Sequence, residues 1–84
     1  MKFIHNDHGL RKRGEIVEVT LTSGANVRLM NSSDFSNYKR GRRHRYHGGL
    51  AKKSPLRLQI PSNGHWHVAI DMQGLRGSTK ASVR

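Results

Sequence analysis

The chain has 84 residues and a formal net charge of +11, because 16 lysines and arginines face only five acidic residues. This length allows one domain, residues 1–84, and the absence of cysteine excludes disulfides, thiolate zinc sites and a cysteine nucleophile. No apolar run approaches the roughly 20 residues that span a bilayer, and no apolar stretch follows Lys2, so we expect a cytoplasmic protein without a membrane anchor.

Apolar and polar residues alternate along several short segments, which is the pattern of half-buried β-strands. The clearest segment places Trp66, Val68 and Ile70 on one face, so that His65 and His67 share the opposite face. Turn-forming residues separate the segments from one another. The predicted strands cover residues 15–21, 26–30, 56–60, 65–72 and, with a weaker pattern, 78–84.

Residues 32–40 have the features of a short helix. Ser32 or Ser33 is suited to cap its N-terminus, and Gly41 is suited to end it. A helix of this length is unstable alone, so we expect it to lie across one end of a sheet. Many short strands and one helix predict an all-β domain, mainly an antiparallel β-sandwich or a small barrel. Residues 41–54, rich in glycine and arginine, are expected to form a basic loop, in which residues 45–50 are either a strand or a mobile segment.

Half of the basic residues gather between Phe35 and Ile70, a stretch without a single acid. If side chains that are close in sequence also form one patch, they produce a one-sided positive field that attracts polyanions. Tyrosines and histidines interleave with these cations, as in surfaces that contact phosphates and stack on bases. The predicted anion-binding residues, with nucleic acid as the favoured ligand, are Lys39, Arg40, Arg42, Arg43, Arg45, Lys52, Lys53 and Arg57.

His65 and His67 are two residues apart on a predicted strand, so their side chains project to the same face. Some β-sandwich proteins present two metal-binding imidazoles in this way, but a metal also needs a third ligand. Asp71 shares this face, yet it lies four residues along the strand, roughly 13 Å away. We therefore predict no metal and no other cofactor, and we keep the two histidines as candidate ligand-facing residues.

Several sequence blocks resemble a small bacterial family that is catalogued only as a domain of unknown function. The most specific block is Gly64-His-Trp-His-Val68 within a basic, cysteine-free chain, and the likeness runs over nearly the whole length. The resemblance implies a compact β-rich domain, found alone or joined to signalling domains of the bacterial immune type, with no catalytic residues to carry over. His8 and the cations of residues 42–45 depart from the family's usual residues. The other matching blocks are residues 1–5, 15–21 and 26–30, Ser54-Pro55, Asp71 and Gly74.

These patterns together favour a binding module that is not an enzyme, because no convergent set of nucleophile, base and metal ligands can be named. Nucleic acid, bound largely without sequence specificity, is the favoured partner, and an acidic protein surface is the second. A membrane-surface helix is excluded, since glycines interrupt the basic run. Two alternatives stay open: a sensory or carbohydrate-binding β-sandwich with its ligand at His65 and His67, and a small mobile-element protein that blocks host nucleic-acid-directed immunity. An exposed strand edge also offers a route to a homodimer.

Overall fold

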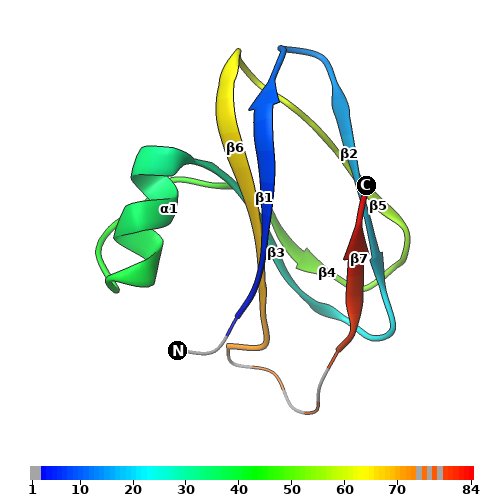
Figure 1. Ribbon diagram of the computed structural model, residues 1–84. Helices are drawn as coiled ribbons and strands as arrows, with labels where there is room; N and C mark the ends of the chain where they lie inside the picture. Colours follow the sequence, from blue (N-terminus) through cyan, green and yellow to red (C-terminus); the bar gives the residue numbers. More distant parts are fainter. Residues whose placement is uncertain (1–2, 74, 76, 78) are drawn as a thin grey trace.

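The computed structural model describes residues 3–73, 75, 77 and 79–84, and it shows two antiparallel β-sheets packed face to face (Figure 1). The predictions made for Gly74 and Ser78 concern residues outside these ranges. The elements are β1 (Ile4–Arg11), β2 (Ile16–Leu21), β3 (Ala25–Asn31), α1 (Ser32–Lys39), β4 (His47–Ala51), β5 (Leu56–Gln59), β6 (Gly64–Asp71) and β7 (Ala81–Val83). The larger sheet has the strand order β1-β6-β3-β4 and the smaller sheet the order β5-β2-β7.

The hydrophobic core fills the space between the two sheets. Val17 and Val19 of β2 meet Val27 of β3 and Val68 of β6 there, and all four side chains are buried. These residues alternate with polar neighbours, so the sequence period of two corresponds to the inner and outer faces of the sheets. The predicted all-β sandwich with one short helix is therefore confirmed, and the described strands do not close into a barrel.

Helix α1 lies on the outer face of the larger sheet, opposite the smaller sheet (Figure 1). Phe35 and Tyr38 point from the helix to the sheet and form a second, smaller apolar cluster with Met30 and Ala69. The prediction that the helix lies across one end of a sheet is wrong, because these two aromatic rings need an apolar surface and find it on the face of β3 and β6. Among the described residues, no helix has the length and apolar character that a membrane crossing requires.

The helix begins and ends close to the predicted bounds, but with a different cap. The side chain of Asn31, rather than Ser32 or Ser33, accepts a hydrogen bond of 2.8 Å from the backbone N–H of Asp34. At the other end, Gly41 adopts a backbone φ of +70°, which turns the chain back over the helix terminus.

Two strands lie outside the segments with a clear alternation of apolar and polar residues. Strand β1 is an edge strand with several exposed side chains, so it lacks a clear alternation, and its pairing with β6 is irregular between Asp7 and Gly9. Strand β4 lies within the basic segment 41–54, where a strand over residues 45–50 is one of the two interpretations that the sequence leaves open. Its backbone pairs with β3 although Gly48 and Gly49 have low strand propensity, because the neighbouring strand supplies the hydrogen-bond partners.

Candidate anion-binding site

The outer face of the larger sheet carries a buried carboxylate, Asp71, at the end of β6. Only 2% of this residue is exposed. The hydroxyl of Tyr38 donates to its Oδ2 atom at 2.6 Å, and Nε of Arg28 donates to the same atom at 3.1 Å. The side-chain amide of Asn26 and the backbone N–H of Gln73 donate to Oδ1 at 2.9 and 3.1 Å. Asp71 thus ties the helix, β3 and the end of β6 together.

The titration of Asp71 and Tyr38 reflects this network. Burial alone would raise the pKa of Asp71, but the hydrogen bonds from Tyr38, Asn26, the backbone of Gln73 and Arg28 hold that pKa below its ordinary value. Burial, and then the hydrogen bond to the carboxylate, raise the pKa of Tyr38 well above that of a free phenol. Asp71 is therefore ionised and Tyr38 neutral at physiological pH.

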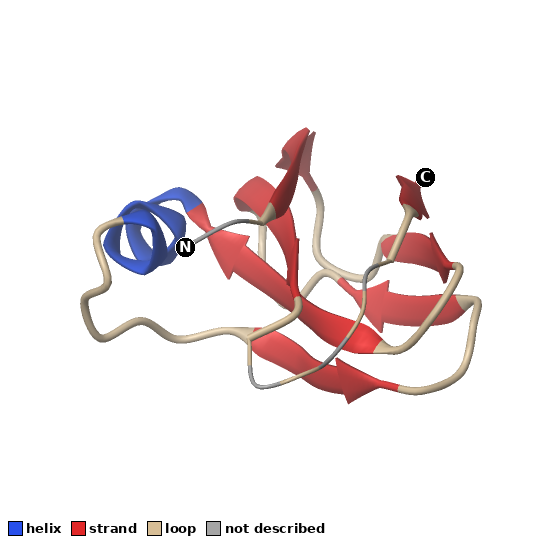
Figure 2. Ribbon diagram, turned by 90° about the horizontal axis from the view of Figure 1, so that it is seen from below, coloured by secondary structure: helices blue, strands red, loops and turns tan. Residues whose placement is uncertain are grey.

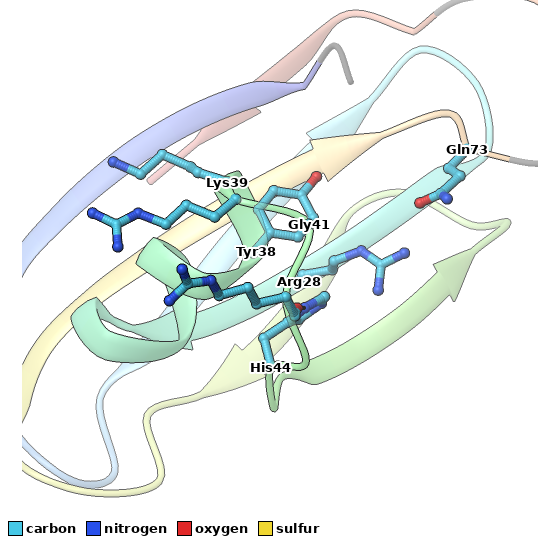
Figure 3. A pocket seen from close by; sticks show the side chains of 8 residues that line it. Arg28, Tyr38, Lys39, Gly41, His44 and Gln73 are labelled. Atoms are coloured by element: carbon cyan, nitrogen blue, oxygen red, sulfur yellow. Dashed lines mark hydrogen bonds between the residues drawn. The ribbon is translucent and has the colours of Figure 1, made fainter.

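A pocket of about 500 Å³ opens above this network, beside the C-terminal end of α1 (Figure 3). We call it the basic pocket. Four of the side chains around it are cationic and none is acidic, so its lining is strongly electropositive. The residues that line it are Arg28, Tyr38, Lys39, Arg40, Gly41, Arg42, His44 and Gln73.

The fold brings the cations of this pocket together by two independent routes. Lys39 occupies the last turn of α1 and Arg40 caps it, where positive charge is favourable next to the helix C-terminal carbonyls. After the turn at Gly41, the backbone N–H of Arg42 donates to the carbonyl of Asn37 at 2.8 Å and folds the loop against the helix. Arg28 approaches from β3, so it enters the site only through tertiary structure.

Arg28 is held in place from two sides. Its Nε bonds to Asp71, and its guanidinium carbon lies 4.6 Å from the centre of the Tyr46 ring and 5.7 Å from that of Tyr38. A guanidinium with one nitrogen fixed by a carboxylate keeps its remaining N–H donors for a further ligand. Sequence alternation predicts only that Arg28 faces outward, and it gives no sign of these contacts.

His44 adds a polar atom with no partner among the described residues. Its Nδ1 lies 2.9 Å from the carbonyl of Arg42, so this nitrogen carries the proton and donates. The other ring nitrogen, Nε2, is buried and makes no hydrogen bond within the described structure. His44 lines the basic pocket, but its Nε2 is a buried acceptor and offers no donor to an anion there.

The eight predicted cations do not form one patch. Lys39, Arg40 and Arg42 line the basic pocket, and Arg43 is the next residue of the same loop. Arg45 lines a second cavity of about 270 Å³ together with Asp34, whose carboxylate accepts from the Arg45 backbone N–H. Lys39 ends α1, and the loop that connects α1 to β4 carries the other four residues; Figure 2 shows this loop in tan.

The other three predicted cations lie elsewhere on the molecule. Lys52 and Lys53 follow the far end of β4 and line a small cavity of about 150 Å³ near the turn between β2 and β3. Arg57 lies on β5 in the smaller sheet, where its side chain is 70% exposed and pairs with Glu18 at 3.2 Å. The expectation of a single patch is therefore wrong for Arg57, because β5 belongs to the other sheet and a carboxylate from β2 partly neutralises it.

The predicted ligand-facing histidines differ in their exposure. His67 is only 7% exposed, and its ring nitrogens lie 3.0 Å from His5 Nε2 and 2.8 Å from Ser32 Oγ. The side chain of His65 is 41% exposed and bonds to Asp7 on β1. Trp66 is buried in the inner core, so it offers no stacking surface beside them.

The ionisation of this histidine cluster also follows from its surroundings. Burial lowers the pKa of both His5 and His67, which favours neutral imidazole rings. The hydrogen bond from His65, followed by that from the backbone of Gly9, lowers the pKa of Asp7. Asp7 and His65 are 58 residues apart in sequence, and no local pattern could have indicated their contact.

Comparison with known proteins assigns the chain to a family. No curated protein sequence and no solved structure matches it. Residues 1–84 match the model of a family described as a domain of unknown function (DUF1883). The protein belongs to this family.

Proposed function

We propose that this domain binds nucleic acid, largely without sequence specificity, through the basic pocket and the cations of the adjoining loop. The observation that carries the proposal is the lining of the pocket, in which four cationic side chains meet and no acidic one does. An anion is the ligand that such a lining favours, and arginine guanidinium groups match the geometry of phosphate and of carboxylate.

The cations of the pocket are available for a ligand. No ion pair involves Lys39, Arg40 or Arg42 among the described residues, and all three side chains are exposed. Arg28 is paired with Asp71, but this pair orients the guanidinium at the floor of the site. A donor that is fixed before binding loses less conformational entropy when the ligand arrives.

A polymer of phosphates suits the site better than a single small anion. Arg43 and Arg45 continue along the same loop beyond the pocket, so several backbone phosphates can be contacted in succession. Tyr46 is 43% exposed and offers a ring on which a base can stack. Contacts with phosphates position the nucleic-acid backbone but recognise little of the base sequence. The proposal places the domain in the cytoplasm, where nucleic acid is accessible.

The first experiment compares two variants that lose the same charge. We expect the triple variant Lys39→Gln, Arg40→Gln, Arg42→Gln to bind random 20-nucleotide DNA and RNA at least about tenfold more weakly than the unmodified domain. The matched control, Arg11→Gln, Lys12→Gln, Arg13→Gln, removes three cations near the turn between β1 and β2 and is expected to bind nearly as well. Fluorescence anisotropy at fixed salt measures both.

The salt dependence supplies a second readout. Four phosphate contacts predict that the logarithm of the binding constant falls with the logarithm of salt concentration with a slope of about −3, and the triple variant should have a shallower slope. Equal losses in the two triple variants would reject the pocket, because attraction would then depend on net charge alone. Variant-dependent binding to polyglutamate without binding to DNA or RNA would point to an acidic protein surface instead.

Replacing Arg57 tests the division of the predicted cations between the two sheets. We expect Arg57→Gln to leave nucleic-acid affinity within about twofold, since Arg57 lies on the smaller sheet and is already paired with Glu18. The free energy of unfolding of this variant should be lower than that of the unmodified domain by less than about 1 kcal/mol, as for other exposed ion pairs. A loss of affinity comparable with that of the triple variant would show that the smaller sheet takes part in binding.

A further inference from the structure

The pairing of β1 with β6 assembles a cluster of potential metal ligands away from the basic pocket. Asp7 lies opposite His67 in the register of the two strands, and His65 lies two residues before His67 on the same face. The nearest ligand atoms of these three side chains all lie within 4.8 Å of one another. Two imidazoles and one carboxylate form a common ligand set for zinc and similar divalent ions.

We propose that Asp7, His65 and His67 bind one divalent transition-metal ion of the zinc class. The third ligand that the sequence pattern lacked is Asp7, which the strand pairing supplies in place of the distant Asp71. Three protein ligands leave a further position for water or for a group of a partner molecule. None of the three residues lines the basic pocket, so the two proposed sites use different side chains.

The arrangement needs a rotation of His65 to accept the ion. The rings of His65 and His67 are stacked with an interplanar angle of 8° and a centroid separation of 4.7 Å, so the exposed His65 ring has to turn until one of its nitrogens faces an ion in the plane of the His67 ring. Ligand atoms at about 2.0–2.2 Å from a zinc ion lie roughly 3.3 Å apart in a tetrahedral site. Asp7 and His65 are 53% and 41% exposed and are free to close this difference around the fixed, buried ring of His67.

The hydrogen bonds that these three residues make are also compatible with metal binding. The hydrogen bond between His65 Nε2 and Asp7 Oδ1 is made by a proton, and a cation takes the place of that proton when it binds both groups. His67 is bonded at one nitrogen to His5 and at the other to Ser32, so an ion that binds one nitrogen replaces that partner while the other hydrogen bond is kept. Such an outer hydrogen bond orients the ligating ring.

Binding of Zn²⁺ to the untagged 84-residue chain, measured by calorimetry, tests the site, and the absorption spectrum of added Co²⁺ reports the ligand type. We expect one equivalent to bind, and Asp7→Asn and His65→Ala each to weaken binding at least about tenfold. Both positions are partly exposed, so these variants are expected to fold. His47→Gln, which removes an exposed histidine of β4, is the matched control and should bind as the unmodified protein does.

Two outcomes would overturn the proposal. The absence of binding of one equivalent of Zn²⁺ would do so. Equal weakening by His47→Gln would do so as well, because it would show diffuse binding to surface histidines. Nucleic-acid affinity of the Asp7→Asn variant serves to separate the two proposals, since loss of the metal site is expected to leave binding at the basic pocket unchanged.

Discussion

Replacement of Asp71 by asparagine is expected to lower the free energy of unfolding by about 3 kcal/mol. Its carboxylate receives hydrogen bonds from Tyr38, Arg28 and Asn26 in a site where it is 2% exposed. Removing one partner of a buried ion pair leaves the other charge uncompensated, which costs about 3–5 kcal/mol. The lower end applies because the side chain of Arg28 keeps 14% of its surface in contact with water.

Urea denaturation measures this effect, and Glu18→Gln is the matched control. Glu18 also accepts a hydrogen bond from an arginine, but its partner Arg57 is 70% exposed, so the loss should stay below about 1 kcal/mol. Similar losses in the two variants would show that Asp71 does not anchor the network. For a small domain with roughly 5–15 kcal/mol of stability, the expected Asp71 effect is a large fraction of the total.

The ionisation of Asp71 also predicts how the stability of the unmodified domain, compared with that of the Asp71→Asn variant, depends on pH. The pKa of Asp71 is lower in the folded domain than its ordinary value of about 3.9. Its contribution to stability is therefore complete above pH 4 and is lost as the pH falls through the folded pKa. The difference in unfolding free energy between the unmodified domain and Asp71→Asn should shrink below about pH 4. A difference that stays constant down to the acid limit would contradict this account.

Gly48→Ala is the second substitution with a large expected effect. Gly48 of β4 has a φ of +115°, a conformation that side chains with a Cβ rarely adopt. A Cβ built at this position would collide with the carbonyl oxygen of Val27 on β3, a backbone atom that cannot move aside. Backbone strain and overpacking each cost about 1–3 kcal/mol, so we expect a loss of about 2–6 kcal/mol.

The neighbouring glycine separates these two contributions. Gly49 has a φ of +137°, but a Cβ there would meet nothing within 4 Å, so Gly49→Ala should lose only the strain contribution, about 1–3 kcal/mol. Denaturant unfolding of the two variants gives the comparison directly. Equal losses would show that β4 moves away from β3 at no cost, and then the close packing at Gly48 would not stabilise the edge of the sheet.

The strands with strong alternation could be predicted because their inward side chains face a continuous apolar core. Val17 and Val19 of β2 and Trp66 and Val68 of β6 all lie where the period of two places them. Strands β1 and β4 could not be predicted in this way. They are edge strands that join the sheet through backbone hydrogen bonds, which leave little trace in the side-chain pattern.

The residues of the candidate site also fall into two groups, those that the local sequence indicates and those that only the fold brings to the site. Lys39, Arg40 and Arg42 come together because a short helix and a glycine turn bring them close within four residues, which local sequence reveals. Arg28 joins them, and Arg57 does not, because strand order decides which sheet each arginine belongs to. The sequence shows that the charge of a segment is positive, but it does not show on which face of the folded molecule that charge lies.

From sequence alone, the chain determines an excess of positive charge, a sandwich-type core and the two faces of its best strand, since these depend on composition and short-range periodicity. Only tertiary structure decides the pairing of Asp7 with His65 and of Arg28 with Asp71. Residues 58 and 43 positions apart meet there because the backbones of separate strands pair, and that pairing is a property of the whole fold.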